Sequence, residues 1–216
     1  MAAAATLALA AGAVASVAVY NNAFPSANSV KDMKQIEGGG PCDKSFRDKS
    51  KVMRVAVKHG ERLCAYSPPV QGDGALPDHE FIAVGRVLKE STPSSVRDAT
   101  YLSLLVRVSA GDSYELQVTP KGRKFKLIRE PDGSGFPITG TSNAIDGLGE
   151  KNVLRLRAFG AKISAYVNGE RVASMTDDDP GEVGGRKLAL GIGSRKDAEK
   201  GPVGTFDNVR VLVPNP

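Results

Sequence analysis

The sequence predicts an all-β fold in which two antiparallel sheets pack as a sandwich. Short runs of alternating apolar and polar residues recur from residue 52 to residue 213, and each run has the length of a strand. Clusters of Gly, Pro, Asn and Asp separate the runs at regular intervals, as expected for turns between strands. No amphipathic helix of useful length follows residue 30. Alternating strands have one buried and one solvated face, which favours two packed antiparallel sheets over a parallel α/β fold.

The predicted strands follow one another along the body of the chain, with polar or Pro- and Gly-rich loops between them. We expect strands at residues 52–58, 62–66, 81–88, 101–108, 114–118, 124–129, 152–159, 162–167, 172–174, 187–192 and 205–213. Asn168-Gly169 separates two of these runs. Both residues tolerate the positive φ of a type I′ turn, so the pair predicts a tight hairpin.

The first fifty residues differ in composition from this body. Residues 2–20 are uncharged and rich in Ala and Val. Such a run is a signal peptide or a membrane anchor of about 20 residues, with an Ala-rich buried helix as the alternative. A basic segment before the run is missing, which fits a start codon assigned too late or a chain that is the tail of a longer receptor. We therefore expect an N-terminal apolar helix at 1–20, a linker at 21–50 and the sandwich domain at 51–216.

Two cysteines, Cys42 and Cys64, bear on the compartment. They are too few for a structural metal site, and their spacing is not C-x-x-C. If the chain is exported, a single Cys42–Cys64 disulfide is expected, and otherwise two buried thiols. With the apolar start, this predicts an extracytoplasmic protein, either secreted or anchored to the membrane.

The overall charge is basic, +5, while aromatic residues make up 6% and Trp is absent. A basic chain suits nucleic acid, anionic lipid or an acidic glycan, but a mildly basic solvated surface is the simpler reading. The Lys and Arg residues are spread along the chain, and their tightest cluster is Lys121, Arg123, Lys124 and Lys126. Because single-stranded nucleic-acid sites depend on aromatic platforms, we expect no nucleic-acid partner.

The order of several motifs resembles a known family. Residues 101–108 read YLSLLVRV, residues 149–177 read GEKNVLRLRAFGAKISAYVNGERVASMTD, and residues 206–211 read FDNVRV. This order is similar to the concanavalin A-like jelly roll, most of all to its laminin-G-like and 3-keto-disaccharide hydrolase-type branch. The resemblance covers about residues 81–213. It implies a jelly-roll sandwich of the kind found outside the membrane anchor of bacterial receptor-like proteins.

Catalytic patterns are missing from the sequence. Glucanases of this superfold place two carboxylates a short spacing apart on one strand, whereas Glu115 stands alone on its strand. A serine-hydrolase site would need His59 or His79, but no G-x-S-x-G element accompanies them, and both are expected at the surface. Asp177, Asp178 and Asp179 could bind Ca²⁺ as laminin-G-like domains do, or form a solvated acidic turn. No other cofactor is expected.

The candidate binding residues are polar positions that alternate away from the apolar faces of the strands. They are Tyr101, Arg107, Gln117, Arg155, Arg157 and Tyr166. Arg offers a planar fork for acidic groups or sugar hydroxyls, and Tyr offers a stacking face with a polar tip. The alternative is that these are ordinary solvated side chains.

These observations predict a non-catalytic binding module whose partner is a glycan or cell-envelope polymer, with the membrane as a second contact through the N-terminal segment. A structural or protein-interaction ectodomain of a membrane receptor is the first alternative. A glycoside-processing hydrolase is the second.

Overall fold

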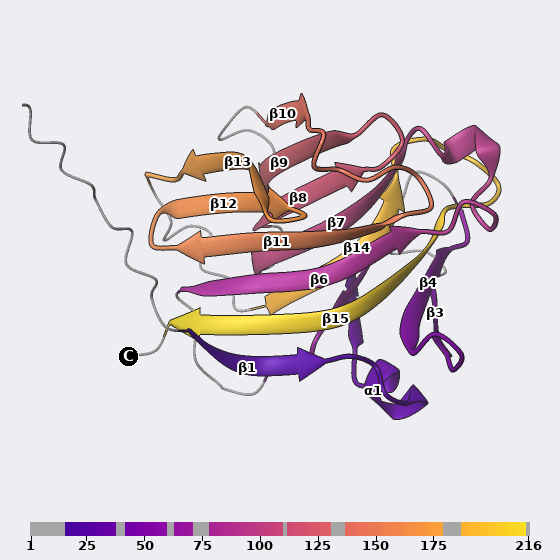
Figure 1. The fold of residues 1–216 in the computed structure, drawn as a ribbon, viewed down its shortest axis with the longest axis horizontal. Helices are drawn as coiled ribbons and strands as arrows, with labels where there is room; N and C mark the ends of the chain where they lie inside the picture. The colour runs from indigo at the N-terminus through magenta and orange to yellow at the C-terminus, as the bar shows by residue number, and fades with distance from the viewer. Residues whose placement is uncertain are drawn as a thin grey trace, which may run out of the picture.

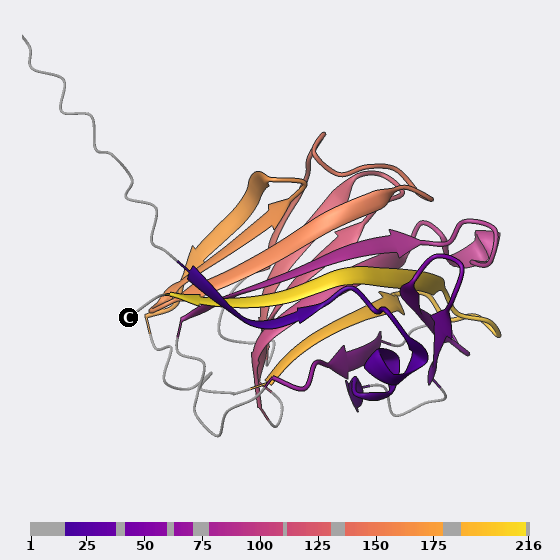
Figure 2. The same cartoon turned by 60° about the horizontal axis from the view of Figure 1, so that its bottom comes forward.

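The computed structural model describes residues 16–37, 42–59, 63–70, 78–109, 112–130, 137–178 and 187–214, which form two antiparallel sheets packed face to face (Figures 1 and 2). We call the eight-stranded sheet sheet I and the seven-stranded sheet sheet II. In spatial order, sheet I contains β13 (Glu170–Thr176), β12 (Lys162–Val167), β11 (Lys151–Phe159), β6 (His79–Val87), β15 (Val203–Pro214), β4 (Val52–Val57) and β3 (Cys42–Arg47), and β1 (Ser16–Asn22) also pairs with β15. Sheet II contains β10 (Ile138–Thr141), β9 (Lys124–Glu130), β8 (Ser113–Thr119), β7 (Thr100–Val108), β14 (Lys187–Ser194), β5 (Leu63–Ser67) and β2 (Lys34–Glu37). Helix α1 (Ala27–Lys31) and a short 3₁₀ helix, Ser94–Val96, lie in the connections.

The predicted sandwich is therefore confirmed. Each strand expected from residue 52 onward has its counterpart among β4–β9 and β11–β15, with ends that differ by a few residues. The hairpin at Asn168-Gly169 is also present, with φ of 49° and 88° at the two residues. Asn168 does more than turn the chain, because its side-chain amide donates to the carbonyl of Ala144 at 2.8 Å and to the Asp146 carboxylate at 3.1 Å. The turn thus holds the loop before β11 in place.

The N-terminal prediction differs from the structure. Residues 1–15 lie outside the described residues, but residues 16–20 belong to strand β1 and not to an apolar helix. The expected linker at 21–50 contains α1, β2 and β3 and contributes Phe24, Val30 and Met33 to the core, so the folded unit begins well before residue 51. The polar side chains that suggested a linker project from exposed strands, which need only one apolar face. Among the described residues, no helix is long and apolar enough to span a membrane.

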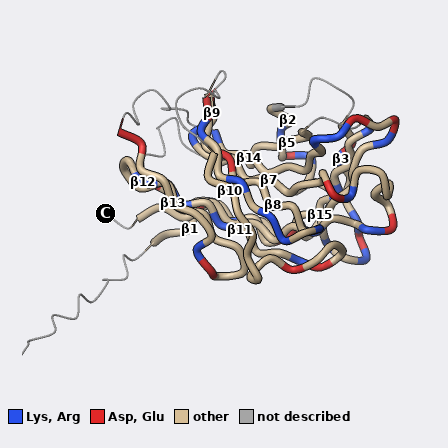
Figure 3. The backbone as a smooth tube through the Cα atoms, turned by 90° about the horizontal axis from the view of Figure 1, so that it is seen from above, with Lys and Arg blue, Asp and Glu red and all other residues tan. Residues whose placement is uncertain are grey.

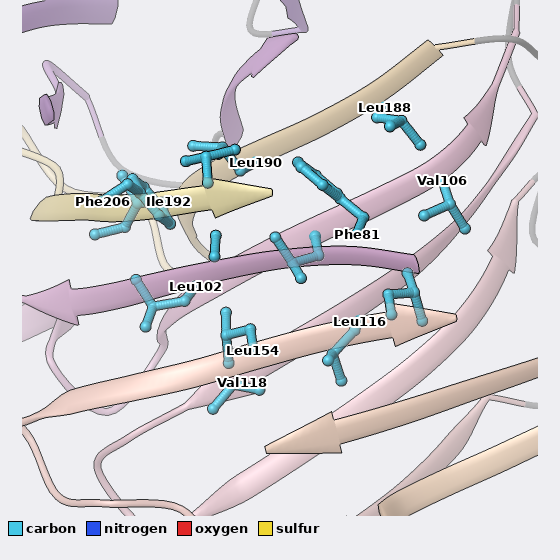
Figure 4. Packing of buried hydrophobic residues seen from close by; sticks show 14 of the residues in the cluster. Phe81, Leu102, Val106, Leu116, Val118, Leu154, Leu188, Leu190, Ile192 and Phe206 are labelled. Carbon is cyan, nitrogen blue, oxygen red and sulfur yellow. The ribbon is translucent and has the colours of Figure 1, made fainter. Parts of the chain in front are cut away.

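The core lies between the sheets and is apolar from both sides (Figure 4). Leu102 and Ile192 of sheet II pack toward Phe206 of sheet I, and all three are fully buried. Close approach requires glycine on the facing sheet: a Cβ at Gly85 would lie 2.9 Å from Leu102 Cδ1, and one at Gly204 would lie 2.7 Å from Ile192 Cδ1. Each such buried side chain contributes about 1.5–3 kcal/mol, so this interdigitation is a main source of stability.

Two β-bulges change which way side chains face. In β15, Asn208 has a φ of 48° and the register with β6 shifts between Asp207 and Arg210. As a result Phe206 and Val209, three positions apart, are both fully buried. In β7, Arg107 has a φ of 53°, and the register with β14 shifts beside it. A bulge inserts one residue and reverses the alternation of side chains beyond it. Period-two alternation therefore assigns side chains to the wrong face when it is continued through these positions.

A disulfide joins Cys42 in β3 to Cys64 in β5, with the two Cα atoms 5.8 Å apart. The expected pairing is confirmed. Because β3 belongs to sheet I and β5 to sheet II, the bond ties the two layers together. The cysteines are 22 residues apart, a separation for which loop closure contributes about 3 kcal/mol in the chain-entropy model.

Candidate functional site

The structure divides the six predicted binding residues among three places. Tyr101 in β7 and Gln117 in β8 lie on the outer face of sheet II. Arg155, Arg157 and Tyr166, from β11 and β12, lie on the outer face of sheet I, on the opposite side of the sandwich. Arg107 lies on neither outer face. One ligand cannot contact all six residues, so each place is described separately.

The outer face of sheet II holds a continuous chain of polar side chains, which we call the polar chain: Ser103, Glu115, Gln117, Arg195 and Tyr101. Ser103 Oγ donates to Glu115 Oε1 at 2.6 Å, and Gln117 Nε2 donates to Glu115 Oε2 at 2.8 Å. Arg195 Nε and Nη2 both donate to Gln117 Oε1, the first at 3.1 Å. The Arg195 guanidinium carbon also lies 5.1 Å from the centre of the Tyr101 ring. Each side chain therefore fixes the orientation of the next.

Except for Arg195, which is exposed, the side chains of the polar chain are nearly inaccessible although they point away from the core. Glu115 is 5% exposed, Gln117 7%, Tyr101 6% and Ser103 fully buried. Burying such groups is unfavourable unless they are hydrogen-bonded, and the chain meets that requirement with a carboxylate acceptor at its centre. These hydrogen bonds hold the buried polar groups in fixed orientations, as buried polar networks require.

An apolar patch adjoins the polar chain on the side of β14 and β5. Leu105, Ala65 and Ala189 are buried there, with Ile36 and Leu63 packed against them. Gly191 and Gly193 of β14 pair with Ser103 and Tyr101 and bear no side chain that would cover the polar groups. A Cβ at Gly191 would lie 2.5 Å from the carbonyl oxygen of Cys64, so the backbone of β5 excludes a larger residue.

A pocket of about 330 Å³ lies beside the polar chain on the side of β9 and β10. We call it the lysine pocket. It is lined by Thr119, Lys124, Phe125, Lys126, Thr139, Gly140, Thr141 and Arg195. Arg195 belongs to both features, since it holds Gln117 and also lines the pocket.

The outer face of sheet I carries the remaining arginines in a self-contained arrangement. Glu80 Oε2 lies 3.6 Å from Arg155 Nη1, and Glu80 Oε1 lies 3.3 Å from Arg157 Nε. Arg155 also lies over the ring of Tyr166 and Arg157 over the ring of Phe159, at 5.5 and 4.0 Å. These contacts stabilise β6, β11 and β12 against one another.

Arg107 was expected to face outward, and this expectation is wrong. The bulge turns its side chain toward the end of the inter-sheet space, where it is 7% exposed. Its Nη2 donates to the carbonyl of Gly160 at 2.8 Å, and its guanidinium lies 6.0 Å from the Tyr114 ring centre. Arg107 therefore connects the two sheets and is not available for an outer-face ligand.

Beside Arg107, Asp177 lies in a buried polar cluster instead of an open loop. It accepts a hydrogen bond from the Tyr114 hydroxyl and an ion-pair contact of 3.0 Å from Arg129 Nη1. Burial, reinforced by the hydrogen bond to Asp177, raises the pKa of the Tyr114 hydroxyl above its usual value. Asp178 is exposed, and Asp179 lies outside the described residues. Among the described residues, no three His, Cys, Asp or Glu side chains gather as metal ligands do.

A second cavity, of about 560 Å³, lies at one end of sheet I. Its charged lining residues are Arg47, Arg86, Lys89, Lys151, Glu90 and Glu150. Basic and acidic groups thus mix in this cavity, as they do over most of the sandwich (Figure 3).

Sequence reasoning missed three contributors to the sheet II face. Ser103 and Glu115 lie on predicted strands, but only the pairing of Leu104 with Leu116 shows that they are neighbours. Arg195 lies in a predicted loop, and no local signal connects it with Gln117, which is 78 residues away. His79, expected at the surface, is 1% exposed at the start of β6.

Comparisons with known proteins support the fold. No protein-family model matches the sequence, and no curated protein sequence matches it either. Among solved structures, a Bacillus subtilis protein of unknown function with a galectin-like fold is 12% identical, with a TM-score of 0.61 over 92% of this chain and 97% of that one. An endo-1,3-β-glucanase (laminarinase) catalytic domain from Thermotoga petrophila is 11% identical, with a TM-score of 0.64 over 94% and 100%. Carbohydrate-binding module CBM66 from Bacillus subtilis is 12% identical, with a TM-score of 0.56 over 83% and 94%. The resemblance to the concanavalin A-like superfold is thus confirmed, while its laminin-G-like and 3-keto-disaccharide hydrolase branch is not.

Proposed function

We propose that this chain is a non-catalytic carbohydrate-binding module that acts outside the cytoplasm and holds its ligand on the outer face of sheet II. The observation that carries this proposal is the polar chain, in which Glu115 orients Gln117 and Gln117 orients Arg195. Sugars present hydroxyl groups around an apolar ring face. Fixed donors and acceptors beside the partly exposed side chains of Ile36 and Leu63 match that pattern.

Two of the similar structures act on carbohydrates by their names, one as a binding module and one as a glucanase. At this level of identity they support a sandwich able to present a sugar site, and the residues of sheet II supply the reason to place the site there. The disulfide supports an oxidising compartment, since such bonds persist outside the cytoplasm. A signal peptide or anchor before β1 remains our prediction for the first residues.

The binding experiment compares two Arg–Tyr pairs on opposite faces. Arg195 lies over Tyr101 on sheet II, and Arg155 lies over Tyr166 on sheet I, at 5.1 and 5.5 Å. We expect Arg195→Ala and Tyr101→Ala to weaken retention on a polysaccharide panel in affinity electrophoresis by about tenfold, a difference of about 1.4 kcal/mol. Arg155→Ala and Tyr166→Ala remove the same groups from the other face and should leave retention unchanged.

The reverse result, with loss confined to the Arg155 and Tyr166 variants, would move the site to sheet I. If the wild-type chain were retained by no polysaccharide in the panel, the module would be a structural or protein-interaction domain instead. Melting temperatures of all four variants show whether each remains folded, so a folding defect is not taken for a lost contact.

One observation favours a hydrolase as the second candidate. Glu130 pairs with Ser113, and Glu115 with Ile128, so the two carboxylates are diagonal neighbours on the outer face of sheet II. The Cα atoms of such neighbours lie roughly 7–8 Å apart, which is near enough for long side chains to approach one another, and glycosidases use a pair of carboxylates. Against this, both oxygens of Glu115 already accept hydrogen bonds. Release of reducing sugar by the wild-type chain but not by Glu115→Gln or Glu130→Gln would establish the hydrolase.

A further inference from the structure

We infer that the ligand is an acidic polysaccharide and that the lysine pocket holds its carboxylate or sulfate groups. This inference rests on the proposed function and adds the chemical class of the ligand. The basic cluster of the sequence, Lys121, Arg123, Lys124 and Lys126, lies at and just before β9. Two of its members, Lys124 and Lys126, line the pocket, which suggests a role for them in binding.

The described part of the pocket lining is basic and contains no acid. Lys124, Lys126 and Arg195 are its charged members among the described residues, and Thr119, Thr139 and Thr141 add hydroxyl groups. By contrast, the larger cavity on sheet I mixes four basic with two acidic side chains. An anion that enters the lysine pocket therefore meets attraction from three cations and repulsion from no carboxylate among the described lining residues.

Strand register explains why these groups converge. Lys126 of β9 lies between Thr139 of β10 and Gln117 of β8, so the three form one row across the outer face. Lys124 lies between Thr141 and Thr119 in the neighbouring row. Lys124 is thus flanked by two threonines, and Lys126 by one threonine and by Gln117, so the neighbours of both lysines offer further hydrogen-bond donors.

The two lysines are not engaged elsewhere in the described part of the chain. No ion pair joins Lys124 or Lys126 to a carboxylate there, whereas Lys51 and Lys58 each have a partner. Lys124 and Lys126 share one face of β9, and a bound anion would relieve the repulsion between them. By strand register, the carboxylate diagonal to Lys126 is that of Glu115, whose oxygens accept hydrogen bonds from Ser103 and Gln117.

The pocket is continuous with the polar chain through Arg195. The guanidinium group of Arg195 donates to Gln117 Oε1, and Arg195 also lines the pocket. A polysaccharide bound over the polar chain would therefore place a charged group of the same or the next sugar near Lys124 and Lys126. The volume, about 330 Å³, is at the small end of ligand pockets and suits one charged group with part of its ring. Charge-assisted contacts of this kind are shorter and stronger than neutral ones, and they weaken as salt rises.

The experiment measures affinity for matched polymers by isothermal titration calorimetry. The probes are polygalacturonate and its carboxyl-reduced neutral form, and chondroitin sulfate with its desulfated, carboxyl-reduced neutral form. We expect Lys124→Met/Lys126→Met to weaken binding of the preferred acidic polymer by about tenfold or more and to leave the neutral form unchanged. Arg47→Met/Lys151→Met removes equal charge from the cavity on sheet I and serves as the matched control, with no change expected.

Each result other than the expected one contradicts either the acidic ligand, the proposed function or both. Equal affinity for acidic and neutral forms overturns the acidic ligand but leaves the proposed function, whereas no binding to any polymer overturns both. Inorganic sulfate bound as tightly as a sulfated polymer would reduce the pocket to a simple anion site. Single-stranded DNA bound more tightly than every polysaccharide, through the same two lysines, would replace the glycan with nucleic acid.

Discussion

Glu115 accepts a hydrogen bond of 2.6 Å from Ser103 Oγ on a face of the sandwich that points away from the core. The second carboxylate oxygen accepts from Gln117 Nε2 at 2.8 Å. This leaves the Gln117 carbonyl oxygen directed toward Arg195, which donates to it. One buried carboxylate therefore decides how an amide and a guanidinium group, on separate segments, are presented to a ligand.

Replacing Glu115 by Gln should disturb both stability and binding. In the variant, an NH₂ group replaces one of the two carboxylate oxygens that accept from Ser103 Oγ and Gln117 Nε2. One of these buried donors would therefore lose its acceptor. We expect the free energy of unfolding to fall by about 1–3 kcal/mol in urea titrations, and polysaccharide affinity to fall with it. Glu80→Gln, which removes the charge between two arginines on sheet I, is the control and should leave binding unchanged. If a folded Glu115→Gln protein bound polysaccharide with normal affinity, the polar chain would not be part of the binding site.

Much of this face could be predicted, because period-two alternation identifies outward positions on any regular strand. Tyr101 and Gln117 were assigned to the outside on that basis, and they lie there. Alternation gives no sheet order, however, so it could not separate these residues from Arg155, Arg157 and Tyr166 on the other sheet. The contact of Arg195 with Gln117 likewise depends on the pairing of strands that are far apart in the sequence. The site needs strand order, which nonlocal contacts determine.

The disulfide and the hairpin turn could be predicted for a different reason: each depends on few residues. Two cysteines allow one intrachain bond, and Asn-Gly specifies its turn locally. The missed strands β2 and β3 lie in a charged stretch whose strand pattern is weak, because one side of each is exposed. Their position depends on partners β5 and β4 more than on their own sequence.

The bulge at Arg107 leads to a prediction about backbone strain. A left-handed conformation costs a residue with a side chain roughly 1–2 kcal/mol, and glycine avoids that cost. Both Arg107→Ala and Arg107→Gly lose the hydrogen bond to Gly160, but we expect the glycine variant to be about 1 kcal/mol more stable in urea unfolding. Neither should alter carbohydrate affinity. An alanine variant as stable as the glycine variant would contradict the left-handed bulge.

Asp177 leads to a prediction about calcium. Its carboxylate already binds Tyr114 and Arg129 in a nearly closed space, which leaves little of it for a metal ion. Removing the charge leaves Arg129 without that ion pair, so Asp177→Asn should lower stability by about 3 kcal/mol, with or without calcium. The measurement is thermal unfolding in EDTA and in excess calcium. A calcium-dependent rise in Tm that Asp178→Ala abolishes would instead establish a metal site at the acidic loop.

Two buried tyrosines predict loss of stability at alkaline pH. Burial, and to a lesser extent the nearby Asp43, raises the pKa of Tyr66 from 10.0 to about 12. The pKa of Tyr114 is raised as well, by burial and by Asp177. The unfolded chain releases both protons near pH 10, while the folded chain keeps them. Ionisation therefore stabilises the unfolded state above pH 10, and each tyrosine lowers the free energy of unfolding by up to about 1.4 kcal/mol per pH unit.

Urea unfolding at successive pH values from 8 to about 11.5 measures this slope. Tyr66→Phe removes one titrating group and loses no hydrogen bond that the structure records. We therefore expect its stability to match that of the wild-type chain below pH 9 and to exceed it increasingly between pH 10 and about 12, the pKa of Tyr66 in the folded chain. Lysines titrate in both proteins, so their effect cancels in the difference. Both cysteines are paired, which excludes thiol exchange begun by a free cysteine of this chain. If the stability of the two proteins fell equally with pH across this range, the pKa of Tyr66 would not be raised by burial in the folded chain.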